Sequence, residues 1–168
     1  MSPVTVVNTY AYSVNYLASN MLRQLQELIR ELGLNPHRFA DDWPSSERAM
    51  ATWLGSRDLV SVALEIYNPS KPTTAILVPE FDIVYGSDAD SDGSFWVDGE
   101  AIRYEILKAG ALPSQCGYSL LCYTKPGRPE VDGWGPVGER SRDGMNRYIA
   151  GRTIGAPGLS ATSAYWAR

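Results

Sequence analysis

The sequence predicts a single α+β domain in which a mainly antiparallel sheet packs against about three helices. Residues 13–34 repeat apolar side chains at spacings of three and four, which is typical of a helix with one buried face. Residues 59–67 and 73–85 read as strands joined by a proline-rich turn, which indicates an antiparallel hairpin. The chain has 168 residues, of which 44% are hydrophobic, and this suits one domain with a sizeable core.

The first long element is the helix over residues 13–34. Ser13 is the expected N-cap, because its hydroxyl can accept a backbone N–H of the first turn. Gly33 stands at the left-handed C-cap position, and Pro36 prevents continuation. Polar residues on the other faces are too numerous for a membrane span. Residues 1–12 are expected to form a tail or short strand. The apolar stripe comprises Val14, Leu17, Met21, Leu25, Leu28 and Leu32.

A short helix and the hairpin follow. Residues 36–44 read as an irregular connection, and residues 46–55 as a helix ended by Gly55. Alternation of apolar and polar residues predicts a half-buried strand over residues 59–67. The strand over residues 73–85 contains Pro79, where a kink or bulge is expected because proline donates no ladder hydrogen bond.

A third helix and a third strong strand complete the core, which we place at residues 13–124. The helix covers residues 98–110, with Asp98 as its cap and Gly110 as its end. The strand covers residues 117–124 and has opposed faces. One face carries Tyr118, Leu120 and Cys122, and the other carries Ser119, Leu121 and Tyr123.

The character of the chain changes at residue 125. Residues 125–168, hereafter the C-terminal segment, hold eight of the fifteen glycines and have turn chemistry with no helical pattern. Only Arg147–Ile149 and Ala164–Trp166 read as short β-prone pieces. So long an irregular stretch in a compact domain is unusual unless it is functional. We expect a mobile flap that wraps over the core; the alternative is a rigid loop that covers it.

The composition excludes several classes of protein. A net charge of −4, with basic residues scattered along the chain, argues against binding to nucleic-acid phosphates. The spacing of Cys116 and Cys122 fits no disulfide framework, and free thiols indicate a reducing cytosol. Residues 1–10 lack the charged and apolar regions of a signal peptide, so a cytoplasmic protein that contacts no membrane is expected.

No motif carries a catalytic mechanism. Asp88–Gly93 begins like a calcium loop, but the twelfth position holds Gly99, so a solvated turn is the better interpretation. Gly133–Gly138 matches GxGxxG, although Pro136 interrupts it and no strand and helix flank it. The single histidine, His37, lies in a connection and is expected at the surface. We therefore expect no enzyme activity, no cofactor and no metal.

The order of elements resembles the HORMA domain, a peptide-binding fold. More closely, the chain is similar to bacterial HORMA proteins encoded in antiphage (CBASS) operons beside cyclic-oligonucleotide synthases. The resemblance covers nearly the whole chain. It rests on NTYAYSVNYLASNML, WLGSRDL, LEIYNP, FDIVYG, DGSFW, AGALPSQCGY, TKPGRPEVDGW and RDGM.

The resemblance implies a two-state adaptor without chemistry of its own. The C-terminal segment would be the safety belt, which in the closed state crosses over an extended closure-motif peptide that adds a strand to the sheet. Closed protein would bind and activate a cGAS/DncV-like nucleotidyltransferase, and an AAA+ ATPase would pull on the N-terminal tail to reopen it. The alternatives are a structural module that self-associates by capturing another copy's tail, and a small calcium-responsive protein.

Two sets of candidate site residues follow. The strand over residues 117–124 is the expected platform for the peptide, because edge addition uses main-chain hydrogen bonds and alternate side-chain pockets. The tail residues expected to engage the ATPase are Pro3, Val4, Val6 and Asn8. The candidate peptide-binding residues are Tyr118, Leu120, Leu121, Cys122, Tyr123, Met145, Tyr148, Ile149, Tyr165 and Trp166.

Overall fold

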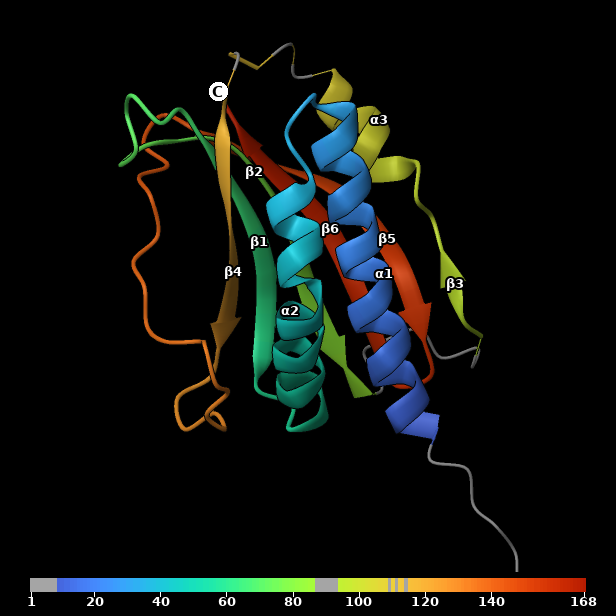
Figure 1. Ribbon diagram of the computed structural model, residues 1–168. Helices are drawn as coiled ribbons and strands as arrows, with labels where there is room; N and C mark the ends of the chain where they lie inside the picture. The colour runs from blue at the N-terminus through green and yellow to red at the C-terminus, as the bar shows by residue number, and fades with distance from the viewer. Residues whose placement is uncertain (1–8, 87–93, 109, 111, 114) are drawn as a thin grey trace, which may run out of the picture.

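Three helices cover one face of an antiparallel sheet in the computed structural model (Figure 1), which confirms the predicted α+β class. The structure describes residues 9–86, 94–108, 110, 112–113 and 115–168. Within these residues the sheet has the strand order β3-β5-β6-β2-β1-β4. The helices are α1 (Thr9–Glu31), α2 (His37–Gly55) and α3 (Ala101–Leu107). The strands are β1 (Leu59–Tyr67), β2 (Ala75–Tyr85), β3 (Trp96–Val97), β4 (Gly117–Thr124), β5 (Asn146–Ala156) and β6 (Leu159–Ala167).

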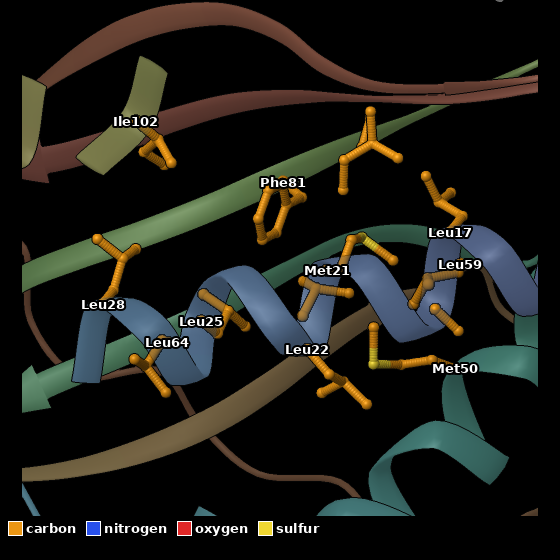
Figure 2. Close-up of a cluster of buried hydrophobic side chains, with 14 of the residues drawn as sticks. Leu17, Met21, Leu22, Leu25, Leu28, Met50, Leu59, Leu64, Phe81 and Ile102 are labelled. Atoms are coloured by element: carbon orange, nitrogen blue, oxygen red, sulfur yellow. The ribbon is translucent and has the colours of Figure 1, made fainter. Parts of the chain in front are cut away.

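The apolar stripe of α1 is the centre of the core, as its spacing predicts. Figure 2 shows side chains of α1 packed among residues of β1, β2, α2 and α3. The helix begins at Thr9, so the expected N-cap at Ser13 is wrong; the Ser13 hydroxyl instead donates to the Pro157 carbonyl at 2.7 Å. The C-terminal end is confirmed: Gly33 has φ +76° and the Leu34 amide donates to the Ile29 carbonyl at 2.9 Å.

Helix α2 is longer than predicted. Residues 36–44 are not an irregular connection, because the helix begins at His37 and includes Pro44. A proline inside a helix removes one backbone hydrogen bond. Packing offsets this loss, since Phe39 is 6% exposed and contacts Trp43 edge-on with ring centroids 5.9 Å apart. Tertiary contacts therefore outweigh the local signal for a break.

The β1–β2 hairpin is confirmed, but its bulge lies elsewhere. The register of the two strands shifts between Ile66 and Tyr67, next to the start of β2. At Pro79 the pairing of β2 with β6 continues without a shift, opposite Tyr165. The predicted bulge at Pro79 is therefore wrong. Helix α3 is shorter than predicted: its N-cap is Glu100 rather than Asp98, and it ends at Leu107, before Gly110. Asp98 lies just before the helix, where its Oδ1 accepts the backbone N–H groups of Glu100 and Ala101, each at 3.2 Å.

The C-terminal segment contains much more regular structure than expected. Strands β5 and β6 form a hairpin of 11 and 9 residues that pairs with β2, and its buried side chains belong to the main core. Small residues and glycines hid the alternating pattern. Packing explains why residue 155 is a glycine: a Cβ there would lie 2.2 Å from the indole nitrogen of Trp96. The segment has no helix, as predicted.

Candidate functional site

Strand β4 is at one edge of the sheet. It pairs with β1, for example Leu64 opposite Leu120, and no other strand of the described residues joins its outer side. Each of its eight residues is half-buried. An edge strand presents unpaired N–H and C=O groups that can pair with another chain. This edge is therefore a ready platform for an added strand.

A groove of about 420 Å³ runs beside β4, between this strand, α2 and residues 125–145 of the C-terminal segment. We call residues 125–145 the crossing loop and the cavity the β4 groove. Figure 1 shows the crossing loop (orange) passing outside β4 before it turns to β5. The apolar part of the groove is lined by Phe39, Trp53, Leu120, Cys122, Trp134 and Val137.

The two sides of β4 contact different parts of the fold, as the alternation predicts. Tyr118, Leu120 and Cys122 pack against the main core on the helix side. The Tyr118 hydroxyl donates to the Asn35 carbonyl at 2.5 Å, and the amide of Phe39 donates to that hydroxyl at 3.3 Å. These bonds join the first half of β4 to the start of α2.

The crossing loop is attached to α2 by two tryptophans. The indole nitrogen of Trp53 donates to the Pro129 carbonyl at 2.8 Å, and that of Trp134 donates to the Ser45 hydroxyl at 3.1 Å. The two rings meet at 90° with centroids 5.7 Å apart. Both hydrogen bonds join the crossing loop to α2, so the loop closes the helix side of the groove.

The crossing loop is also attached to the opposite face of the sheet, which we call the back face. Arg140 Nη1 lies 2.9 Å from Glu65 Oε1, and the Arg140 amide donates to Glu65 Oε2 at 2.7 Å. The Arg140 guanidinium also lies 3.6 Å from the ring centroid of Tyr67. The Glu65 side chain is completely buried, so this pair has little exposure to screening by solvent.

Two further arginines bind Glu80 on the same back face. Arg147 Nε donates to Glu80 Oε1 at 2.7 Å, and Arg142 Nη1 lies 3.6 Å from Glu80 Oε2. Between these arginines, Met145 is buried in a small apolar cluster with Ala63 and Val78. The crossing loop thus passes from the helix side, around the β4 edge, to a fixed position on the back face.

The groove does not activate its cysteine. Burial raises the pKa of Cys122 to about 12, and the nearby charge of Arg128 opposes this shift. The thiol is therefore neutral near pH 7 and acts as a small apolar side chain rather than a nucleophile. Cys116 and Cys122 are both free, as predicted.

The structure brings together only part of the predicted site. Tyr118, Leu120, Leu121 and Cys122 line the β4 groove, and Tyr123 lies on the back face, where its hydroxyl donates to Glu139 at 2.6 Å.

The remaining candidates do not line the groove. Four of them lie on β5 and β6, which β2 and β1 separate from β4, and Met145 lies at the end of the crossing loop. Met145 and Trp166 lie in the back-face cluster, and Tyr148 stacks on Tyr165 with centroids 5.1 Å apart. Ile149 is 68% exposed on β5. The tail candidates Pro3, Val4, Val6 and Asn8 lie outside the described residues.

Sequence reasoning missed the wall of the groove opposite β4. Phe39, Trp53 and Trp134 line it, together with Arg128 and Val137. A tryptophan in a glycine-rich stretch was the one available signal for Trp134. Phe39 and Trp53 read simply as core residues, because nothing local distinguishes a groove wall from a buried helix face.

The other motifs add no chemistry. The acidic stretch Asp88–Gly93 lies outside the described residues. No helix follows Gly133–Gly138, which is part of the crossing loop, and His37 is exposed at the start of α2. Among the described residues, no group of three or more His, Cys, Asp and Glu side chains could hold a metal ion. Of the three helices described, none is long and apolar enough to cross a membrane.

Comparisons with known proteins give the family. No curated protein sequence matches the chain. A chain of the E. coli MS115-1 HORMA:CdnC:Trip13 complex has a TM-score of 0.59 and 13% identity, with 98% of this chain and 95% of that chain covered. C. elegans HTP-2 bound to HTP-3 closure motif 1 has a TM-score of 0.56 and 13% identity, with coverages of 99% and 95%.

A chain of the mitotic checkpoint complex has a TM-score of 0.62 at 11% identity, with coverages of 78% and 74%. At these identities the likeness shows a shared fold. The family model for bacterial HORMA domain 2 matches residues 1–168, the whole chain. This chain therefore belongs to the bacterial HORMA domain 2 family.

Proposed function

We propose that this protein is a non-catalytic, cytoplasmic signalling adaptor that holds an extended closure-motif peptide in the β4 groove. In the closed, peptide-bound state it binds and activates a cGAS/DncV-like nucleotidyltransferase of bacterial antiphage defence. An AAA+ ATPase then reopens it by pulling on the N-terminal tail, including Pro3, Val4, Val6 and Asn8. The output of the protein is its conformation, because no group of the groove is placed to do chemistry.

One observation carries the proposal: the unpaired edge of β4 lies beneath a loop that is attached on both sides of it. Trp134 bonds to Ser45 on the helix side, and Arg140 binds Glu65 on the back face. A peptide paired with β4 would gain main-chain hydrogen bonds along a strand of about 26 Å. It could leave only if the crossing loop lifts, so its affinity would come mainly from slow dissociation.

The same arrangement supports a closed state. The crossing loop passes around the β4 edge, and β6 then pairs with β2, with β5 on the outer side of β6. Opening would require the loss of the Arg140–Glu65 and Arg147–Glu80 pairs and of the β2–β6 ladder. Such a change converts one packed arrangement into another, which is how two-state switches work. We propose the C-terminal segment as the moving part.

The partners are proposed from the relatives. An E. coli HORMA protein forms a complex with the CdnC nucleotidyltransferase and the Trip13 ATPase, and C. elegans HTP-2 binds closure motifs. The peptide-binding residues proposed here are Tyr118, Leu120, Leu121 and Cys122 of β4, with Phe39 and Trp134 opposite. A non-catalytic role is supported by the neutral thiol of Cys122 and the exposed position of His37.

Reconstitution tests the proposal. A cGAS/DncV-like nucleotidyltransferase is assayed alone, with this protein, and with this protein plus a peptide selected for binding to it. We expect strong stimulation only when both the protein and the peptide are present. A matched control uses Leu120→Arg, which places a charge in the groove. Equal stimulation without a peptide, or by this variant, would rule out peptide-gated activation.

A further inference from the structure

Arg128 is the one arginine of the β4 groove for which the described part of the chain supplies no carboxylate. Its guanidinium lies 4.6 Å from the ring centroid of Trp53, and Nη1 donates to the neighbouring Pro129 carbonyl at 3.1 Å. Arg38, at the other end of the groove, pairs with Asp42. Arg140 on the back face pairs with Glu65.

This unpaired guanidinium favours an anionic group. Arg128 is half-buried against an indole, so part of its hydration is already lost. Hydrogen bonds between a guanidinium and a carboxylate are short and about twice as strong as neutral ones. The protein as a whole has a net charge of −4, so any attraction for an acid in the groove has to be local.

The position of Arg128 along β4 gives the spacing. Arg128 lines the groove with Cys122 and lies against the Trp53 ring. The Phe39 amide donates to the Tyr118 hydroxyl, near the start of the strand. Leu120 lies between Tyr118 and Cys122 on the same face of β4. Residues two apart on a strand share a face and lie about 7 Å apart. A strand paired with β4 therefore places alternate side chains beside Leu120 and beside Cys122.

We propose that the guest of the β4 groove is a peptide that carries a large apolar side chain and a carboxylate two positions apart. The apolar side chain occupies the part of the groove lined by Phe39, Leu120 and Trp134, and the carboxylate pairs with Arg128. The side chain between them faces the back side of β4, toward Ser119 and Leu121. This inference rests on the proposed peptide-binding function and adds the chemical class of the peptide.

Selection from a phage-displayed library of random peptides tests the proposal. With the full chain as bait, we expect enrichment of Asp or Glu two positions from a Leu, Ile, Met or Phe. With Arg128→Glu as bait, we expect Lys or Arg at that position. With Arg38→Gln as bait, the acidic preference should remain, because Arg38 is exposed and paired with Asp42.

A double-mutant cycle measures how strongly Arg128 and the peptide carboxylate interact. It uses Arg128→Gln, so it does not require the Arg128→Glu variant to fold. A selected peptide is made with an amidated C-terminus, so that only its side-chain carboxylate supplies the charge, and its Asp→Asn form is compared. Replacing the acid should weaken binding to the original protein about tenfold, and should change binding to Arg128→Gln by less than about threefold.

Each outcome distinguishes the inference from the function on which it rests. Peptides that bind the groove without an acidic preference, or with one that Arg128→Gln does not reduce, would overturn the role of Arg128 and leave peptide binding intact. If no selected peptide binds the protein in a way that Leu120→Arg abolishes, both the role of Arg128 and the peptide-binding function are overturned.

Discussion

Arg140 binds Glu65 through both its side chain and its backbone. The two contacts measure 2.9 Å from Nη1 to Oε1 and 2.7 Å from the amide nitrogen to Oε2. Glu65 belongs to a core strand and Arg140 to the crossing loop. A fully buried carboxylate of the core therefore receives its compensating charge from the segment that we propose moves.

Replacing Arg140 with Gln should loosen the crossing loop and destabilise the fold. Removing one partner of a buried pair leaves an uncompensated charge, and the typical cost is about 3–5 kcal/mol. Because the Arg140 side chain is 22% exposed, we expect the lower end of that range. Urea unfolding measures the free energy, and limited proteolysis within residues 125–145 measures the loosening.

The control for this prediction is Arg38→Gln. Its ion pair with Asp42 has a separation of 3.9 Å and both side chains are mostly exposed, so the cost should be less than about 1 kcal/mol. Combining Arg140→Gln with Glu65→Gln should recover part of the loss, because no buried charge remains unpaired. Equal effects of Arg140→Gln and Arg38→Gln on the free energy of unfolding would contradict a stabilising role for the Arg140–Glu65 pair.

Replacing Trp134 with Ala should speed release of a bound peptide. The change removes the bond to Ser45 and the edge contact with Trp53, which hold the crossing loop on α2. We expect dissociation to be about tenfold faster with little change in association, as is usual for contacts that form after the encounter. Biolayer interferometry with a selected peptide measures both rates.

Tyr104→Ala is the matched aromatic control. Tyr104 is 63% exposed on α3, and it is absent from the lining of the groove. Dissociation from this variant should equal that from the original protein. If Trp134→Ala also leaves dissociation unchanged, the crossing loop does not retain the peptide.

The order of the core elements could be predicted from the sequence because their patterns are strong. The stripe of α1, the alternation in β1 and the alternation in β4 each have a period that specifies one kind of element. The two faces of β4 were also predictable, since Tyr118 and Leu120 differ from Ser119 in polarity. These patterns were enough to identify the platform of the candidate site.

The wall of the site and the hairpin of the C-terminal segment could not be predicted. Strand β6 is mostly small residues, so its alternation is weak, and Gly151 and Gly155 in β5 resemble loop residues. Pro44 suggested a break that packing around Phe39 overrides. Sequence alone also cannot show that Trp134 reaches α2, because that contact joins residues 89 positions apart.

Cys122 should be alkylated slowly, and a peptide in the groove should slow it further. Its pKa is raised to about 12, so the thiolate fraction is very small near pH 8 and the rate should still increase with pH above 9. Iodoacetamide labelling of Cys116→Ser, followed by mass spectrometry, isolates the Cys122 rate. A rate that levels off near pH 9, or that a bound peptide does not change, would contradict a half-buried Cys122 thiol that lines the groove.

Leu25→Ala tests the core that supports the site. Leu25 is fully buried in the stripe of α1, so the change should cost about 2–5 kcal/mol in the free energy of unfolding. Leu107→Ala is the control, because Leu107 is 47% exposed and should cost less than about 1 kcal/mol. Chemical denaturation of the two variants compares the costs. Similar values would show that the α1 stripe is not the centre of the core.

The most direct test of strand addition is hydrogen–deuterium exchange of β4 with and without a selected peptide. Alternate amides over residues 117–124 point to the open edge, so a paired peptide should protect them by tenfold or more, whereas the amides of residues 146–149 in β5 should change little. Unchanged exchange throughout β4 when the peptide is bound would contradict the central claim that this edge receives the guest.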